Sequence, residues 1–396
     1  MTGFKAFPLM DSILEQLALK GYKDPTPVQK ESIPILLEGR DLLGIAQTGT
    51  GKTAAFSLPM INKFGKNRID IEPHCTRALI LTPTRELASQ IMDNIDDYAE
   101  GLNLKTKVVY GGARRRDQVE ALKHGLDILV ATPGRLLDLI RSGDVNFKQL
   151  EVFILDEADT MLDMGFFDDV QLVTEQLPET RQTALFSATM PETIESLGHA
   201  ILISPLKVEI APESSTVDLV DQKIFFLEKA NKKFSLNSIL ENRKYESVLV
   251  FCKTKFGADI VVEDLLKTSV TAAAIHSKKS QTDRERALQD FKDGKIRVLV
   301  ATDVAARGID VDNISLVINF NLPEDPRNYI HRIGRTARAG KRGVAISFCV
   351  ENDLVLLKSI EKNINQKVPV DTTQPFHKEF QVAAKKKKKP KKKYKF

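Results

Sequence analysis

The stretch AQTGTGKT (46–53) decides the fold of this chain. The residues before it, LLGIA (42–46), are typical of a buried strand, and those after it, AAFSLPMINKF (54–64), are typical of a helix. Glycines between a strand and a helix let the backbone curl, so that several N–H groups point at a phosphate beside the positive helix terminus. The stretch therefore predicts a phosphate-binding loop within an α/β sheet.

The residues of this loop have expected parts in nucleotide binding. Lys52 would reach the β- and γ-phosphates, and Thr53 would be a ligand of Mg²⁺. The loop begins with Ala46 where the usual pattern has glycine. The alternative is a Gly/Thr-rich turn that holds one lysine by chance, and the strand–loop–helix context disfavours it. The residues expected around the nucleotide are Ala46, Gln47, Thr48, Gly49, Thr50, Gly51, Lys52 and Thr53.

Three carboxylates in LDEADTM (155–161) directly follow the apolar run VFI (152–154). Phosphoryl transfer needs Mg²⁺ to bridge the terminal phosphates and a group to orient the attacking water. An aspartate at a strand end beside a phosphate loop is the usual partner of magnesium, so we assign that part to Asp156. Glu157 points elsewhere and suits the base or water-positioning role. The alternative is that these acids only stabilise a helix N-terminus through its macrodipole. The phosphate loop earlier in the chain disfavours this alternative.

Short apolar runs alternate with helical patterns along the whole chain. Continuous apolar strands between helices indicate parallel sheets covered on both faces, and 396 residues favour two domains. The expected strands are 42–46, 78–83, 108–111, 128–133, 152–156 and 183–189 in the first half, and 248–252, 273–276, 297–303, 316–320 and 344–350 in the second.

The stretch ISPLKVEIAPESSTVDLV (203–220) is the expected connection between the two domains. It has two prolines, three consecutive Ser/Thr residues and few helix formers. The expected organisation is a first α/β domain over 1–205, a linker over 206–220, a second α/β domain over 221–368 and a lysine-rich, disordered tail over 369–396.

The charge of the chain is unevenly distributed. The net charge is +5, but the last twelve residues, KKKKKPKKKYKF (385–396), hold nine lysines and no acid, so the rest carries 5 − 9 = −4. Such a tail repels itself and attracts polyanions. We expect it to be an auxiliary tether for nucleic acid. The alternative is an end that only keeps the chain soluble.

Membrane insertion and disulfides are not expected. No apolar run approaches the ~18–20 residues that span a bilayer, and the N-terminus lacks the pattern of a secretory signal. The three cysteines, Cys75, Cys252 and Cys349, are far apart in sequence and show no metal-binding spacing. These features predict a protein of the reducing cytoplasm.

Further motifs occur in order along nearly all of residues 7–342. They are GYKDPTPVQ (21–29), PTRELA (83–88), GG (111–112), TPGR (132–135), DEAD (156–159), SAT (187–189), VFCKT (250–254), QTDR (281–284), ATDVAARGID (301–310) and HRIGRTAR (331–338). This ordered set resembles the DEAD-box RNA helicases of superfamily 2. The resemblance implies two tandem RecA-like α/β domains, ATP and Mg²⁺ as cofactors, and RNA as substrate. The short N-terminus and RTARAG (335–340) near the lysine-rich tail resemble the bacterial RhlE-type branch.

On the nucleotide side, the resemblance implies that Gln29 reads the adenine edge, because an amide both donates and accepts in one plane. Tyr22 would stack on the base, helped by Phe7, and Asp310 would lie near the ribose. Without their flanking motif, Gln29 would be an ordinary helix residue and Tyr22 a packing residue. A further set would couple ATP to domain closure or lie between the domains: Asp159, Ser187, Thr189, Asp303 and His331.

On the RNA side, the resemblance implies contacts with the phosphate backbone, which position a strand without reading its sequence. PTRELA and TPGR also look like ordinary helix caps, and capping is compatible with phosphate contact. The residues expected in the first domain are Thr84, Arg85, Gly112, Thr132 and Arg135, and those in the second are Thr254, Gln281, Arg284 and Thr302.

Arg335 and Arg338 are the expected arginine fingers. An arginine at the γ-phosphate stabilises transition-state charge and contributes ~10³–10⁵ in rate. HRIGRTAR spaces Arg332, Arg335 and Arg338 three residues apart, so one helical face is expected to present all three. The alternative is a solvated or salt-bridged basic helix face.

Two small departures leave the expected catalytic set intact. The family often has Asn where Lys253 stands and Gly where Ala337 stands. The expected activity is RNA-stimulated ATP hydrolysis that opens short duplexes, by a monomer. A non-unwinding, ATP-gated RNA clamp is the main alternative, and a DNA translocase is a weaker one. Ribosome assembly, RNA decay and cold adaptation all use such enzymes, so ribosomal precursors and the RNA-decay machinery are both candidate partners.

Overall fold

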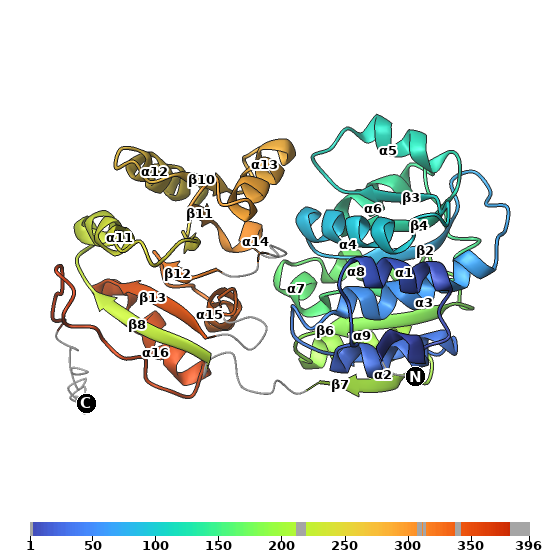
Figure 1. Cartoon of the computed structure of the whole chain (residues 1–396), viewed down its shortest axis with the longest axis horizontal. Coiled ribbons are helices and arrows are strands. Elements are labelled where there is room, and N and C mark those ends of the chain that lie inside the picture. Colours follow the sequence, from blue (N-terminus) through green and yellow to red (C-terminus); the bar gives the residue numbers. More distant parts are fainter. Residues whose placement is uncertain (1–2, 211–218, 307–310, 312–313, 337–341, 381–396) are drawn as a thin grey trace, which may run out of the picture. The chain divides into compact units, whose positions relative to one another are not determined.

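The computed structural model of the chain describes residues 3–210, 219–306, 311, 314–336 and 342–380 (Figure 1). The chain divides into two compact units, each built on one β-sheet. The predicted fold class, tandem α/β domains with parallel sheets flanked by helices, is confirmed. No helix among the described residues has the length and apolar character needed to cross a membrane.

The first unit contains a seven-stranded sheet with the order β3-β4-β2-β5-β6-β1-β7. Every neighbouring pair of strands runs parallel. All six strands predicted for this half are present. The strands are β1 (Leu42–Ile45), β2 (Thr76–Leu81), β3 (Thr106–Val109), β4 (Leu126–Ala131), β5 (Val152–Leu155), β6 (Gln182–Ser187) and β7 (Leu206–Glu209).

Helices cover both faces of the first sheet. Alternate residues of each strand point to opposite sides, so each strand contributes side chains to two cores. Ala78 and Ile80 of β2 pack into one core, and Leu79 and Leu81 pack into the other. The first core is closed by α1 (Asp11–Leu19), α2 (Pro27–Leu37), α3 (Lys52–Lys66) and α4 (Arg85–Tyr98). The second is closed by α5 (Arg115–Leu122), α6 (Pro133–Arg141), α7 (Ala158–Asp163), α8 (Phe167–Thr174) and α9 (Glu192–Ile201).

The strand order brings three functional loops together. In the sheet, β6 lies between β5 and β1, and all three strands are parallel. Their carboxyl ends therefore meet at one edge. The loops that follow them begin with Ala46, Asp156 and Ala188. In open α/β sheets ligands bind outside these carboxyl ends.

The second unit contains a six-stranded sheet with the order β10-β11-β9-β12-β13-β8. The pairs β11–β9, β9–β12, β12–β13 and β13–β8 are parallel. All five strands predicted for this half are present. The strands are β8 (Val220–Phe226), β9 (Val248–Phe251), β10 (Ala272–Ile275), β11 (Val298–Ala301), β12 (Leu316–Asn319) and β13 (Gly343–Cys349).

Helices α11 (Lys232–Glu241) and α12 (Lys255–Leu266) share a core with one face of the second sheet. The helices α15 (Pro326–Ile333) and α16 (Leu354–Asn363) contact each other, and α15 also contacts β12. The other helices among the described residues of this half are α13 (Gln281–Lys292) and α14 (Asp303–Ala306). Short 3-10 turns span Lys229–Asn231 and Glu351–Asp353 in this half and Gly3–Ala6 in the first.

Two strands lie in or beside the stretch interpreted as a linker. Leu206–Glu209 forms β7 and pairs with β1, although 206–220 was predicted to be linker. Val220, the last residue of that stretch, is the first residue of β8. Both lie at a sheet edge, and exposed residues such as Lys207 and Asp221 interrupt the continuous apolar run that marks a buried strand. Residues 211–218 lie outside the described part of the chain.

The beginning of the predicted tail follows the edge of the second sheet. Val370 forms a parallel bridge with Ile224, and the Ile224 N–H donates to the carbonyl of Pro369 over 2.8 Å. Further along, the Lys378 N–H donates to the carbonyl of Phe226 over 2.9 Å. Residues 369–380 are therefore ordered against β8, contrary to the prediction, and 381–396 lie outside the described residues.

Candidate nucleotide and RNA site

The phosphate loop connects β1 to α3, as predicted. Gly49 and Gly51 have φ of 85° and 93°, in the left-handed region that favours glycine. A Cβ atom added to Gly51 would lie 2.4 Å from Nε2 of Gln29, so this position is closed to other residues. The Thr50 hydroxyl donates to the Gln47 carbonyl over 2.8 Å and holds the turn.

Lys52 is the first residue of α3 and lies folded back over the loop. Its Nζ donates to the carbonyl of Ala46 over 2.8 Å, and its side chain is buried. Thr53 follows it in the first turn of α3. The loop thus holds an ammonium group and a helix N-terminus at the same edge of the sheet, which together favour an anion.

Asp156 follows β5 directly and is only 2% exposed. Its Oδ1 accepts a hydrogen bond from the Glu157 N–H over 3.1 Å. Burial raises the pKa of Asp156 to about 7, the nearby Lys52 ammonium lowers it, and the Glu157 carboxylate raises it further. Burial of a carboxylate is costly without a cation, so Asp156 fits a bound divalent ion.

No group of three or more His, Cys, Asp or Glu side chains that could hold a metal ion occurs among the described residues. This excludes, for that part of the chain, a cage built only from protein carboxylates. Mg²⁺ in phosphoryl-transfer sites is instead held by one or two protein ligands plus the phosphates of the substrate. Thr53 and Asp156 are consistent with that arrangement.

Glu157 has a strained backbone beside the phosphate loop. Its φ and ψ are 55° and 51°, in the left-handed region, and it forms the N-cap of α7. Non-glycine residues in this region cost about 1–3 kcal/mol and cluster at functional sites. The Thr48 hydroxyl donates to Oε1 of Glu157 over 3.4 Å. The left-handed backbone therefore goes together with a Glu157 carboxylate that lies against the phosphate loop.

Asp159 makes different contacts from its two acidic neighbours. Its Oδ2 accepts from both the N–H and the hydroxyl of Thr189, each over 2.9 Å. The Ser187 hydroxyl accepts from the Asp159 N–H over 3.3 Å and donates to the Thr189 carbonyl over 2.6 Å. The structure thus brings together the three residues that the sequence grouped as coupling residues.

Gln29 connects the N-terminus of α2 to the phosphate loop. Its Oε1 accepts from the Thr26 N–H over 2.9 Å, which completes a capping box, and its Nε2 donates to the Gly51 carbonyl over 3.1 Å. The aromatic residues expected beside the base form a chain of ring contacts. Phe4 contacts both Phe7 and Tyr22, with ring centroids 6.2 and 6.3 Å apart.

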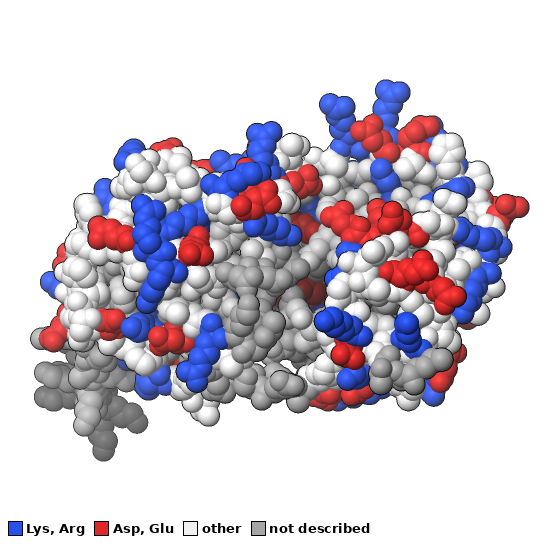
Figure 2. Space-filling model, in the orientation of Figure 1, with Lys and Arg blue, Asp and Glu red and all other residues white. Residues whose placement is uncertain are grey.

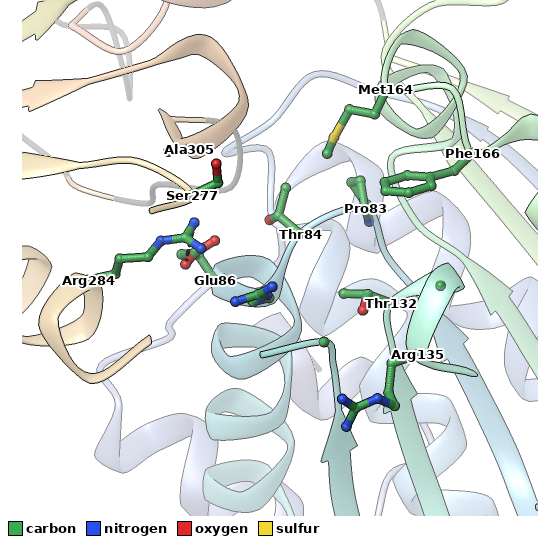
Figure 3. A pocket seen from close by; sticks show the side chains of 13 residues that line it. Pro83, Thr84, Glu86, Thr132, Arg135, Met164, Phe166, Ser277, Arg284 and Ala305 are labelled. Carbon is green, nitrogen blue, oxygen red and sulfur yellow. Dashed lines mark ion pairs between the residues drawn. The ribbon is translucent and has the colours of Figure 1, made fainter. Parts of the chain in front are cut away.

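Four of the five RNA residues predicted in the first unit, Thr84, Arg85, Thr132 and Arg135, line one hollow (Figure 3), and Gly112 follows Gly111, which also lines it. Thr84 caps α4 by accepting from the Leu87 N–H over 3.2 Å, and Thr132 precedes α6 as its N-cap. Gly112 has a φ of 88°, and a Cβ added there would lie 2.2 Å from Nη1 of Arg85. The guanidinium of Arg85 therefore lies directly on the GG turn.

Gln118 belongs to this group, although the sequence analysis missed it. It is buried on α5, its Oε1 accepts from Nη1 of Arg135 over 2.9 Å, and its Nε2 donates to the Tyr110 carbonyl over 3.1 Å. It therefore orients Arg135. Gln118 and Leu122 are the buried residues of α5 and lie four residues apart. A glutamine at an apolar position of the helical period is the signal that could have revealed it.

The predicted RNA residues of the second half lie at the ends of its elements. Thr254 caps α12 by accepting from the Gly257 N–H over 3.0 Å. Gln281 is the first residue of α13, and Arg284 lies on its first turn. Thr302 directly follows β11. Thr254 and Thr302 thus lie between a strand and a helix, and Gln281 and Arg284 lie in the first turn of a helix.

Arg332 and Arg335 do not share one helical face, contrary to the prediction. Helix α15 ends at Ile333, so Arg335 lies beyond it, and its Nε donates to the His331 carbonyl over 3.3 Å. Arg332 is buried and pairs with Asp303, with Nε–Oδ1 and Nη2–Oδ2 distances of 2.5 and 2.7 Å. Arg338 and Asp310 lie outside the described residues.

Comparisons with known proteins agree with this site. The DEAD/DEAH box helicase family matches residues 26–197, and the helicase conserved C-terminal domain matches residues 231–340. The ATP-dependent RNA helicase CshA of Listeria monocytogenes is 40% identical over 93% of this chain and 70% of its own length. CshA of Streptococcus pneumoniae is 40% identical over 97% of this chain and 73% of its own length.

Solved structures lead to the same family. Dbp5 of S. cerevisiae bound to RNA and ADP BeF3 has a TM-score of 0.81 and 30% identity, and the match covers 93% of this chain and 96% of that one. A DEAD box protein from Methanococcus jannaschii has a TM-score of 0.54 and 38% identity, over 94% of this chain and 99% of that one. The RhlE-type branch stays a prediction. The chain belongs to the family of DEAD-box ATP-dependent RNA helicases.

Proposed function

We propose that this chain hydrolyses ATP in response to RNA and uses the cycle to open short RNA duplexes and remodel RNA or its protein complexes. One observation carries the proposal: Lys52, Asp156 and Glu157 are all buried at one edge of the first sheet. A lysine, a magnesium-binding aspartate and a water-orienting carboxylate are the groups that ATP hydrolysis requires. Similarity to RNA helicases and to a helicase bound to RNA supports RNA as the partner.

In this proposal Thr53 and Asp156 hold Mg²⁺ together with the ATP phosphates. When bound there, the ion would supply positive charge that stabilises the negative charge developing on the phosphates. Lys52 binds the β- and γ-phosphates, and the backbone N–H groups of residues 46–51 surround them. Glu157 orients the attacking water and accepts its proton, because its carboxylate is fixed by the strained turn and by Thr48.

Gln29 selects adenine in this proposal. Its amide accepts from the Thr26 N–H and donates to the Gly51 carbonyl. A base that binds to this amide is therefore coupled through Gly51 to the phosphate loop. Tyr22 is 39% exposed, which leaves ring surface for a base to stack on. Phe4 contacts the Tyr22 ring, and Phe7 contacts Phe4.

RNA binds through its backbone in this proposal. Arg85 and Arg135 supply guanidinium groups, which match phosphate geometry. Thr84, Gly112 and Thr132 supply hydroxyl and backbone groups beside them. Such contacts position a strand without reading its bases. Thr254, Gln281, Arg284 and Thr302 are proposed as the corresponding contacts of the second half.

Arg335 and Arg338 are proposed to stabilise the charge that develops on the γ-phosphate. The buried ion pair of Arg332 with Asp303 supports this part for Arg335, because it fixes the end of α15, from which Arg335 follows. Asp159, with Ser187 and Thr189, is proposed to relay the state of the nucleotide to domain closure. His331 and Asp303 are proposed to act in the same coupling, and Asp310 near the ribose.

We further propose a monomer in the cytoplasm whose lysine-rich tail binds RNA. All three cysteines are free and buried, which supports a reducing compartment. The face shown in Figure 2 mixes acidic and basic side chains over both units. This face therefore has no continuous positive surface that would attract RNA. The nine lysines of 385–396 would supply that attraction.

One experiment tests the proposed function. ATP hydrolysis is measured with single-stranded RNA, with DNA of the same sequence and with neither, and strand separation is followed on a short labelled RNA duplex. We expect strong stimulation by RNA, weak stimulation by DNA, and strand separation that depends on ATP. Equal stimulation by DNA contradicts the choice of substrate. RNA-stimulated hydrolysis without strand separation supports the ATP-gated clamp instead.

A further inference from the structure

A groove between α11 and α12 shares no residue with the nucleotide and RNA sites described above. The two helices lie side by side over the second sheet (Figure 1) and contact each other. The groove has a volume of about 220 Å³. Its walls come from the 3-10 turn Lys229–Asn231, from α11, from α12 and from Phe320 after β12. All of these residues belong to the second unit.

The floor of the groove is apolar and continues onto the surface. Leu236, Val261 and Leu265 are core residues that reach it from below. Ile260 on its edge is 41% exposed, and Phe256, one turn earlier on α12, is 75% exposed. Residues four apart share a helical face, so these two side chains extend the floor as one apolar stripe. Contiguous exposed apolar surface of this kind marks interaction sites.

The rim of the groove is positively charged. Lys229 and Lys233 are exposed on it. Lys232 is buried and donates to the Phe320 carbonyl over 2.7 Å. The acid on the rim is Asp264, whose Oδ1 is 3.3 Å from Nζ of Lys267 outside the groove. The rim therefore has an excess of positive charge, which disfavours the chain's own lysine tail as occupant.

The size of the groove narrows the class of ligand. Sites for drug-sized molecules usually measure about 300–1,000 Å³, so this groove fits one or two side chains better than a nucleotide or another cofactor. We propose that it docks an acidic peptide segment of a partner protein, with one aromatic or leucine side chain on the apolar floor and carboxylates on Lys229 and Lys233. An amphipathic segment in a groove between helices is an established mode of recognition.

The test uses a labelled acidic peptide that carries one Phe and one Leu among Asp and Glu residues, titrated with the full-length chain and followed by fluorescence anisotropy. We expect saturable binding that is lost when lysines replace the acidic residues of the peptide. Ile260→Asp and Lys233→Glu should each weaken binding by about tenfold or more, because they oppose the apolar anchor and the charge. Failure of the peptide to bind the unaltered chain overturns the proposal.

Two matched substitutions control for general effects in the same unit. Val355 on α16 is 73% exposed, so Val355→Asp adds a carboxylate to another exposed apolar position, and Lys244→Glu reverses a charge on another exposed lysine. Both should leave peptide binding unchanged, and all four variants should keep RNA-stimulated ATP hydrolysis. Equal loss in the controls, or displacement of the peptide by single-stranded RNA, overturns the assignment to a peptide.

Discussion

Glu157 is the residue whose substitution tests the chemistry most directly. Glu157→Gln keeps the size of the side chain and its contact with Thr48 but removes the base. We expect ATP and RNA binding to be kept and turnover to fall by about 10²-fold or more, the usual contribution of a positioned base. Steady-state hydrolysis and nucleotide binding are measured together, with Glu175→Gln after α8 as control. Normal hydrolysis would show that Glu157 is not the base.

Gly112 offers a test of the RNA surface with an internal control. Gly112→Ala places a Cβ 2.2 Å from the present position of Arg85 Nη1, so the guanidinium must move. Gly143→Ala imposes a similar backbone strain, since its φ is 72°, but meets no atom within 4 Å. We expect both variants to lose about 1 kcal/mol of stability.

Only Gly112→Ala should weaken RNA binding, because only its Cβ reaches Arg85. RNA affinity is measured for both variants by fluorescence anisotropy, and ATP affinity is measured in the absence of RNA. If Gly143→Ala weakens RNA binding equally, the effect comes from backbone strain and the placement of Arg85 has no part in it.

The buried thiols make the chain sensitive to alkaline pH. Burial raises the pKa of Cys252 and of Cys349 from 9.0 to about 12. Below pH 9 both thiols are protonated whether the chain is folded or unfolded. Between pH 9 and about 12 the unfolded chain releases protons that the folded chain keeps, so stability falls as the pH rises through this window.

We therefore expect the denaturant midpoint to fall steadily above pH 9, and to fall less in a Cys252→Ala variant. At pH 8 a thiol reagent should react slowly with the native chain and with all three cysteines after unfolding. Fast reaction of the native chain at pH 8 would contradict the burial of these groups.

At the scale of secondary-structure elements, one buried arginine ties together several parts of the first unit. Arg77 on β2 is 1% exposed, and its Nε lies 2.8 Å from Glu151 and its Nη1 3.2 Å from Asp127. Its guanidinium is 4.1 Å from the ring centroid of Phe64 on α3. Asp127 also accepts from the Lys105 N–H over 2.9 Å. The network thus joins β2, β4, α3 and the residue before β5.

Arg77→Met should lower the free energy of unfolding by about 3 kcal/mol or more, because it leaves the buried Asp127 carboxylate without its partner. Adding Asp127→Asn should recover part of this loss by removing the unpaired charge. The measurement is equilibrium denaturation of the full chain, with the exposed Arg116→Met as control. A double variant as unstable as Arg77→Met alone would show that packing of Arg77, not its charge, stabilises the unit.

At the scale of the whole molecule, the lysine-rich tail should act as an electrostatic tether. Deletion of 385–396 should weaken RNA binding mainly at low salt, since each phosphate contact on a single strand contributes a slope of ~0.7 in log K against log salt. A variant with glutamines in place of the nine lysines keeps the length and should behave like the deletion. Unchanged affinity in both variants would exclude the tether.

The sequence predicted the interior of each sheet better than its edges. All eleven expected strands exist, because a strand buried on both faces requires a continuous apolar run. It missed β7 and β8, each at one edge of its sheet, although the opposite edge strands, β3 and β10, were predicted. In LKVE of β7 only Val208 is buried, so the segment carries no apolar run to detect. Pairing with β1, far away in the chain, makes it a strand.

At the candidate site, too, sequence spacing predicted some contacts and missed others. Sequence spacing grouped Asp159 with Ser187 and Thr189, and the structure joins them by hydrogen bonds. It placed Arg332 on a face with Arg335, whereas Gly334 is the C-cap of α15 and Arg332 turns inward to Asp303. A helix stop at glycine is a local signal that could have corrected this prediction.

The sequence by itself determined the fold class and the family, because apolar periodicity and the residues of the motifs are local properties of the chain. Only the tertiary structure decided that Gln118 orients Arg135, that Glu157 is held in a left-handed turn against Thr48, and that Arg332 is internal. Those facts depend on which strand ends and helix faces meet, and the strand order of a parallel sheet is set by contacts between distant segments.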